Sequence, residues 1–289
     1  MVLMFALSLL FLFGCQSLER DNVYDPYGSN YIGGISSVAV PSSSSSVAAI
    51  TGCGSTETQY CSDGVMKPYG KLTDSRDGKE YKTLVIGGQE WMAENLNYDG
   101  DTGSRYTVGK CIPSNGSVVS DSDCFYAKYG RLYDWVTAMG LSGEAYDYSK
   151  NIYGPTRCGA DCYEPFVLPH RGICPQGWHL PTDAEWTTLV EAAGGASTAG
   201  SNLKAASGWK EDEYYGVKGT DVYGFSALPG GSGLSSGGFG SVGYNGYWWS
   251  STEYNATIAY FWYMLYDDSE VVRYSYYKSN LYSVRCLRD

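Results

Sequence analysis

The spacing of apolar residues along the chain predicts two amphipathic helices. The clearer one follows Thr182, where apolar side chains recur at positions 186, 189, 190 and 193, which is the spacing of a single helix face. Thr182 and Glu185 have the pattern of a capping box, and Gly194-Gly195 ends the helix. The second helix is expected over residues 131–139, because positions 132, 135, 136 and 139 repeat this spacing.

Short apolar runs predict strands. Residues 81–86 and 89–92 flank Gly87-Gly88, the pattern of a hairpin with a two-residue turn. An antiparallel C-terminal set is expected from the runs 246–251, 259–266, 271–274 and 282–287. The 28 tyrosines and 37 glycines favour strands and ordered loops over a helical bundle. The pattern therefore predicts an α+β fold, with two main helices packed on mostly antiparallel short strands and long loops stapled by disulfides.

The first 13 residues are almost wholly apolar and are followed by Gly14 and Cys15. A membrane-spanning helix needs about 20 apolar residues, so residues 1–14 are expected to be a signal peptide. The segment Leu12 to Cys15 resembles a bacterial lipobox, which implies a lipid on Cys15 and a lipoprotein held at a membrane. Phe13 is larger than the usual lipobox residue and no Lys or Arg precedes the run; the alternative is an ordinary signal peptide with an unpaired cysteine.

Residues 15–66 are expected to be a lipidated N-terminus and a flexible linker, because the stretch is polar and contains five consecutive serines at 42–46. Residues 67–289 have the composition of one globular domain. Gln16 follows the lipidated cysteine in place of the aspartate that retains many lipoproteins at the inner membrane. We therefore expect the outer membrane, on its periplasmic or surface face.

Once Cys15 is assigned to the lipid, an even number of cysteines remains for disulfides. Eight cysteines allow 105 pairings, so the sequence leaves their connectivity open. Local pairing would join Cys53 to Cys61, Cys111 to Cys124 and Cys158 to Cys162, and would leave Cys174 with Cys286. A zinc site at Cys158 and Cys162 is the alternative, but no second cysteine pair has ligand spacing. No metal or cofactor is expected.

Charge and motifs exclude several function classes. The formal net charge of −11, without a basic run, argues against nucleic acid as a partner. Residues 238–243 match G-x-G-x-x-G, and residues 233–237 match G-x-S-x-G, but both lie in a glycine-rich stretch. Both histidines precede Ser235, which excludes the α/β-hydrolase order. No catalytic residues are assigned.

Acidic residues are the remaining catalytic candidates. Capping explains Glu185, and an acid in the first turn such as Asp183 suits the helix dipole. Asp267, Asp268 and Glu270 are expected in a solvated turn, with a catalytic or calcium role as the alternative.

Aromatic residues on neighbouring predicted strands give the one physical indication of binding. Because side chains alternate between the two faces of a strand, some should meet solvent, where flat rings bind sugars. The candidates are Trp248, Trp249, Trp262 and Tyr263. The alternative is that these rings fill a two-sided core.

Six blocks of sequence resemble the Fibrobacter succinogenes major paralogous domain, in the order of that family. The blocks are GKEYKTLVIGGQEWMAENLNY (78–98), YGRLYDWVTAM (129–139), ICPQGWHLPTDAEWTTLV (173–190), DVYGFSALPGG (221–231), GYWWSSTE (246–253) and YSVRCLRD (282–289). The resemblance implies a cell-envelope or secreted protein without an established activity. Two blocks are also similar to C-type-lectin-like and formylglycine-generating-enzyme-like domains, which implies a C-type-lectin-like fold with Cys174–Cys286 as its long disulfide. The cysteine pair of formylglycine generation and the calcium-dependent sugar-binding motifs of lectins are absent.

These observations predict a cell-envelope lipoprotein with a non-catalytic binding domain. The expected partners are the membrane, through the N-terminal lipid, and a polysaccharide or another envelope protein. One alternative is an extracellular enzyme that acts on polysaccharide through two carboxylates. Another is a purely structural envelope protein, for which a domain without a pocket would be the sign.

Overall fold

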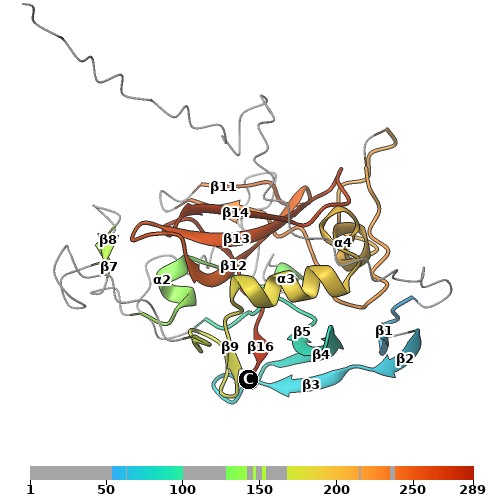
Figure 1. The fold of residues 1–289 in the computed structure, drawn as a ribbon, viewed down its shortest axis with the longest axis horizontal. Helices are drawn as coiled ribbons and strands as arrows, with labels where there is room; N and C mark the ends of the chain where they lie inside the picture. The colour runs from blue at the N-terminus through green and yellow to red at the C-terminus, as the bar shows by residue number, and fades with distance from the viewer. Residues whose placement is uncertain are drawn as a thin grey trace, which may run out of the picture. The chain divides into compact units, whose positions relative to one another are not determined.

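The structure, a computed structural model, describes residues 54–62, 64–99, 128–141, 168–214, 216–234 and 238–289, with the backbone of 146–147 and 152–153. This part of the chain is mostly β, with two five-stranded sheets, three small two-stranded sheets and three helices (Figure 1). No helix in the described ranges is long and apolar enough to cross a bilayer.

The first five-stranded sheet is antiparallel throughout and has the order β3-β4-β5-β16-β9. Its strands are β3 (Gly70–Thr73), β4 (Glu80–Ile86), β5 (Gln89–Met92), β16 (Leu287–Arg288) and β9 (Trp178–His179). The predicted hairpin is confirmed: β4 pairs with β5 across Gly87 and Gly88. Both glycines have positive φ, 59° and 78°, which a two-residue turn of this kind requires.

The second five-stranded sheet has the order β14-β13-β12-β15-β6. Its strands are β14 (Val272–Tyr277), β13 (Ile258–Leu265), β12 (Asn245–Glu253), β15 (Tyr282–Ser283) and β6 (Leu132–Tyr133). The predicted strand over 282–287 was wrong as a single element. Its first part runs parallel to β12, and its last residue belongs to β16 in the other sheet. Residues 284–286 therefore connect the two sheets.

The ordered domain begins before residue 67. Hairpin β1–β2 (Gln59–Ser62 and Val65–Pro68) places Tyr60 in the core, so the linker expected over 15–66 does not extend through these strands. The other two-stranded sheets are β7–β8 and β10–β11. Their bounds are Tyr146–Asp147 and Ile152–Tyr153, and Ser232–Gly233 and Phe239–Gly240.

Helix α3 (Asp183–Ala192) confirms the first predicted helix, including its capping box. Glu185 N donates to Thr182 Oγ1 at 3.2 Å, and Thr182 N donates to Glu185 Oε2 at 2.7 Å. Helix α4 (Ala196–Leu203) was not predicted, because its small and polar residues lack an apolar period. It packs closely instead: a Cβ on Gly200 would lie 2.4 Å from the Glu270 carbonyl oxygen.

The helix expected over 131–139 is shorter than predicted. Only α2 (Trp135–Ala138) is helical, and the two residues before Asp134 form strand β6. The side chain of Asp134 accepts from Thr137 N at 2.7 Å and so caps α2. Pairing of β6 with β15 outweighs the helical spacing, because it places both strand residues in a buried sheet.

The core has two aromatic clusters on opposite faces of β12. Trp248 packs with Trp186 of α3, whereas Trp249 packs with Tyr282, at ring-centroid distances of 6.4 and 4.4 Å. Both tryptophans are fully buried. Consecutive strand residues point to opposite faces, so the paired tryptophans show that β12 is covered on both sides.

His179 links the start of α3 to Asp289, the residue that follows β16. Its Nε2 lies 3.0 Å from Glu185 Oε1, and its Nδ1 lies 2.8 Å from Asp289 Oδ1. Only the protonated imidazole donates from both nitrogens. Although burial lowers the pKa of His179, the two carboxylates raise it further, and the net pKa is above its ordinary 6.5. The pKa of Glu185 is below its ordinary 4.5, because hydrogen bonds from His179 and Thr182 outweigh burial.

This cluster predicts a stability maximum on the acid side of neutrality. The contribution of Glu185 is present above about pH 4.5 and is lost as pH falls through its lowered native pKa. That of His179 is complete below about pH 6.5 and is lost as pH rises through its raised native pKa. Denaturant unfolding across pH 4–9 should show His179→Gln losing about 1–3 kcal/mol near pH 6 and less at alkaline pH. An equal loss at every pH would contradict a charged histidine.

Candidate functional site

The structure confirms one disulfide and leaves most other cysteines outside the described residues. Cys174 and Cys286 are bonded, 112 residues apart in sequence. A loop of that length stabilises the fold by about 4–5 kcal/mol on the chain-entropy account. Cys61 is also disulfide-bonded. The remaining cysteines lie outside the described residues: Cys15, Cys53, Cys111, Cys124, Cys158 and Cys162.

The aromatic candidates are mostly inside the protein. Trp248, Trp249 and Trp262 are buried in the two core clusters, and Tyr263 is partly buried against the second cluster. The three tryptophans therefore present no open ring face to a ligand, which corrects the expectation of exposed binding rings. These tryptophans instead fill a two-sided core, which was the alternative prediction.

The acidic candidates have structural partners. Asp183 accepts from Trp262 Nε1 at 3.0 Å and pairs with Arg273 at 2.6 Å. Asp268 accepts from Glu270 N at 3.0 Å within the turn between β13 and β14. Within the described ranges, no three histidine, cysteine or acidic side chains gather closely enough to hold a metal ion.

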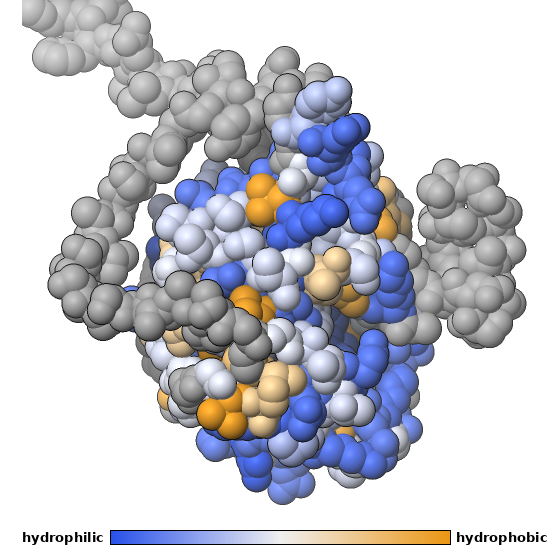
Figure 2. All heavy atoms as spheres, turned by 90° about the vertical axis from the view of Figure 1, so that its right-hand side faces the viewer, coloured by the Kyte–Doolittle hydropathy of each residue, from blue (hydrophilic) through white to orange (hydrophobic). Residues whose placement is uncertain are grey.

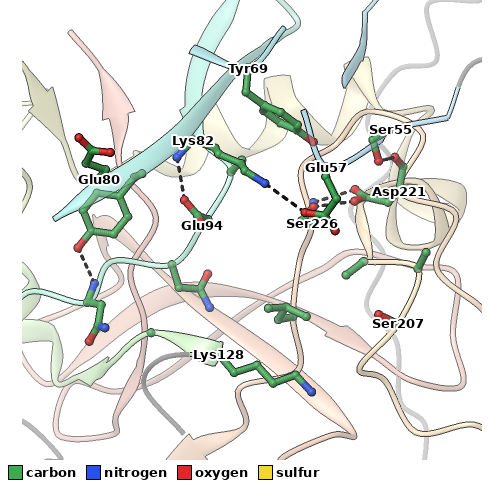
Figure 3. A pocket seen from close by; sticks show the side chains of 18 of the residues that line it. Ser55, Glu57, Tyr69, Glu80, Lys82, Glu94, Lys128, Ser207, Asp221 and Ser226 are labelled. Atoms are coloured by element: carbon green, nitrogen blue, oxygen red, sulfur yellow. Dashed lines mark hydrogen bonds and ion pairs between the residues drawn. The ribbon is translucent and has the colours of Figure 1, made fainter. Parts of the chain in front are cut away.

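The described residues enclose a polar cleft of about 670 Å³, which the sequence alone does not reveal. Four parts of the chain line it: residues 55–57 before β1, the strands and loops over 79–97, residues 205–207 after α4, and the loop 221–228. Figure 3 shows side chains from these segments pointing into one space. Tyr69, Lys128 and Gly130 complete the lining.

The loop 221–228 is held in a strained conformation. Asp221 and Ser226 have positive φ, 46° and 51°, which is uncommon for residues other than glycine. Ser226 donates to the Asp221 carboxylate twice, from its amide at 2.8 Å and from Oγ at 2.6 Å. Burial raises the pKa of Asp221, although these hydrogen bonds oppose the rise. Strain of this kind collects at functional sites.

Arg285 joins this loop to the opposite wall of the cleft. Its Nε donates to Asn95 Oδ1 at 3.0 Å, and its terminal nitrogens donate to the carbonyl oxygens of Phe225 and Ser226, the latter at 3.0 Å. Its guanidinium also lies 4.1 Å from the centre of the Phe225 ring. The residue is 1% exposed, and burial lowers its pKa to about 9.

The wall formed by residues 93–97 is built around Asn95. Its Oδ1 also accepts from Trp248 Nε1 at 2.8 Å, and its Nδ2 donates to the Tyr129 carbonyl oxygen at 2.8 Å. Nearby, Oδ1 of Asn97 is buried and has no hydrogen-bond partner among the described residues. Hydrogen bonds on both ends of the Asn95 amide therefore fix this polar wall of the cleft.

Lys204 positions the short wall at 205–207. Its ammonium is buried and donates to the carbonyl oxygens of Val217, Leu265 and Asp268 at 2.8, 2.9 and 2.8 Å. Burial lowers its pKa to about 8. The three carbonyls fix the end of α4, from which the wall continues.

Tyr69 and residues 55–57 form the remaining wall. Tyr69 donates to the Gly224 carbonyl oxygen at 3.0 Å, and burial raises its pKa to about 12. Ser55 Oγ donates to the Asp221 carbonyl oxygen at 2.6 Å. Glu57, from the same segment, faces Lys82 of β4.

The cleft is lined by hydrogen-bond donors and acceptors, and by side chains of both charges. Its lining includes Lys79, Lys82 and Lys128, and Glu57, Glu80, Glu94 and Asp221. Sequence reasoning did not single out any of these residues, nor Arg285. Asn95, Asp221 and Arg285 lie inside the blocks that carry the family resemblance, which was the only available signal.

The comparisons with known proteins agree with that resemblance. The Fibrobacter succinogenes major domain matches residues 84–288. No curated protein and no solved structure matches the chain.

Proposed function

Since the chain belongs to the Fibrobacter succinogenes major domain family, we propose that it is a cell-envelope lipoprotein whose domain binds polysaccharide in the cleft without catalysis. The lipid is carried by Cys15, and the outer membrane is the proposed location because Gln16 replaces the inner-membrane aspartate. We also propose that the domain has a C-type-lectin-like fold. It is supported by the mostly antiparallel sheets, helix α3 and the long-range disulfide.

The polar cleft is the observation that carries the binding proposal. A polysaccharide presents hydroxyl groups that both donate and accept, and the cleft supplies ammonium donors and carboxylate acceptors. It also contains the partly buried ring of Tyr69, against which the apolar face of a sugar can lie. A purely structural envelope protein would not need such a cleft.

The face of the protein seen in Figure 2 suits a polar ligand better than a large protein partner. On the face seen in Figure 2, hydrophilic residues dominate and hydrophobic residues form small separate patches. Protein-binding sites are typically marked by larger continuous apolar patches. We therefore favour polysaccharide over an envelope protein as the ligand.

An enzyme is the second candidate, because Glu94 and Asp221 both line the cleft. Burial raises the pKa of Asp221, as a general acid would require. Both oxygens of its carboxylate, however, accept hydrogen bonds from Ser226. The carboxylate thus holds the loop, and we favour binding. Release of sugar by the wild type, lost in Asp221→Asn and in Glu94→Gln, would establish the enzyme instead.

Mass spectrometry of the native protein under non-reducing conditions tests the anchor. We expect a chain that begins at Cys15 and carries lipid mass on that residue, because the lipobox-like segment ends there. An intact N-terminus, or an unmodified Cys15, would rule out the proposed anchor.

Binding in the cleft is tested by filling it. Ser207 lines the cleft and is exposed, so Ser207→Trp should reduce affinity at least about tenfold, the effect of about 1.4 kcal/mol. The full chain in detergent is titrated with cellulose, xylan, mannan and peptidoglycan fragments. Ser197→Trp is the control, because Ser197 is an exposed residue of α4 that does not line the cleft.

Two results would contradict this proposal. Absence of binding to all four glycans would remove the sugar-binding function. Equal affinity of Ser207→Trp and Ser197→Trp for a bound glycan would place its site elsewhere.

A further inference from the structure

A loose ion pair spans the cleft between Glu57 and Lys82. Lys82 Nζ and Glu57 Oε2 are 3.7 Å apart, which is longer than a hydrogen bond. The side chains are 99% exposed for Glu57 and 43% exposed for Lys82. Exposed pairs of this kind contribute little to the stability of a protein. A ligand can therefore separate them at small cost.

The ring of Tyr69 lies beside this pair and is held in place. Lys82 Nζ is 5.3 Å from its centre, and the Tyr60 ring packs against it at 5.3 Å between centroids. The hydrogen bond from its hydroxyl to Gly224 fixes the far end of the side chain. A ring that is already immobile loses little conformational entropy when a ligand stacks on it.

We propose that Glu57, Lys82 and Tyr69 are the recognition group for a neutral sugar with two adjacent hydroxyls. This inference rests on the proposed polysaccharide-binding function. One hydroxyl accepts a hydrogen bond from the Lys82 ammonium, and its neighbour donates to the Glu57 carboxylate. The apolar face of the sugar ring lies against Tyr69 once Lys82 has moved toward the hydroxyl.

Donor and acceptor chemistry favours this pairing. An ammonium only donates and a carboxylate only accepts, whereas a hydroxyl does both. Two neighbouring hydroxyls can therefore satisfy both charged groups at once, with charge-assisted hydrogen bonds. The ligand restores the partners that Glu57 and Lys82 give up when they separate.

The charge of the cleft favours a neutral sugar over an acidic one. Three lysines and four acidic residues line it: Lys79, Lys82 and Lys128, and Glu57, Glu80, Glu94 and Asp221. Lys79 is already paired with Asp77 at 3.0 Å. Glu80 is likewise paired, with Lys71 outside the cleft. The other two lysines of the lining face three acidic residues, so a carboxylate on the ligand would meet more negative than positive charge.

Calorimetric titration of the full chain in detergent tests the assignment, with cellohexaose, xylohexaose, mannohexaose and hexagalacturonate as probes. At least one neutral hexasaccharide should bind to the wild type. Glu57→Ala and Lys82→Met should each lower its affinity at least about tenfold, because each substitution removes a hydrogen bond to a charged group. Tyr69→Leu should lower the affinity by a similar factor. Tyr69→Phe retains the ring, so its affinity should stay within about threefold of the wild-type value.

The matched controls are Glu191→Ala and Lys218→Met, two exposed charges that do not line the cleft. They should bind as the wild type does. Wild-type binding that is unchanged in Glu57→Ala and Lys82→Met would overturn this inference and leave polysaccharide binding intact. Binding of hexagalacturonate alone would overturn only the neutral-sugar assignment. Binding of no glycan here or in the wider polysaccharide panel would overturn the proposed function itself.

Discussion

The buried guanidinium of Arg285 sits where the two five-stranded sheets are joined, and the walls of the cleft depend on it. Removing an arginine from water costs several kcal/mol unless its hydrogen bonds are replaced. Asn95 on one wall and the carbonyls of Phe225 and Ser226 on the other replace them. The guanidinium thus holds together two segments that are far apart in sequence. Because these segments form opposite walls of the cleft, their separation sets its shape.

The position of Arg285 is itself fixed from both sides. It lies between β15, in one sheet, and β16, in the other, and the next residue, Cys286, is bonded to Cys174. Strand β12, adjacent to β15, is covered on both faces by aromatic rings. The abundant aromatic residues therefore build much of a rigid core, while the cleft beside it is polar. This division leaves hydrogen bonding, rather than a tryptophan surface, as the proposed means of recognition.

Sequence patterns correctly predicted the elements that depend only on interactions between neighbouring residues. The capping box of Thr182 and Glu185 and the turn at Gly87-Gly88 need only neighbouring residues, and both were predicted correctly. Helix α4 lacks an apolar period and depends on close packing of Gly200 against the turn after β13, which no local pattern encodes. Strand β6 has helical spacing but pairs with β15, some 150 residues later.

The candidate site was beyond sequence reasoning for the same reason. Glu57, Lys82, Asp221 and Arg285 come from distant segments, and only the fold brings them together. Exposure of Trp248, Trp249 and Trp262 was predicted from the alternation of side chains along a strand. Alternation cannot show that both faces of a sheet are covered. Conversely, nothing in the block YSVRCLRD shows that its first arginine, Arg285, joins two loops.

Amide hydrogen exchange of Arg285→Met, compared with the wild type, tests this account most directly. Loss of the guanidinium should increase exchange in residues 93–97 and 221–228 together, by at least about tenfold. Helix α3, which Arg285 does not hydrogen-bond, should keep its wild-type protection. Unchanged protection in both walls would contradict the account, as would an equal loss in α3, because Arg285 would then act on the whole fold rather than on the cleft.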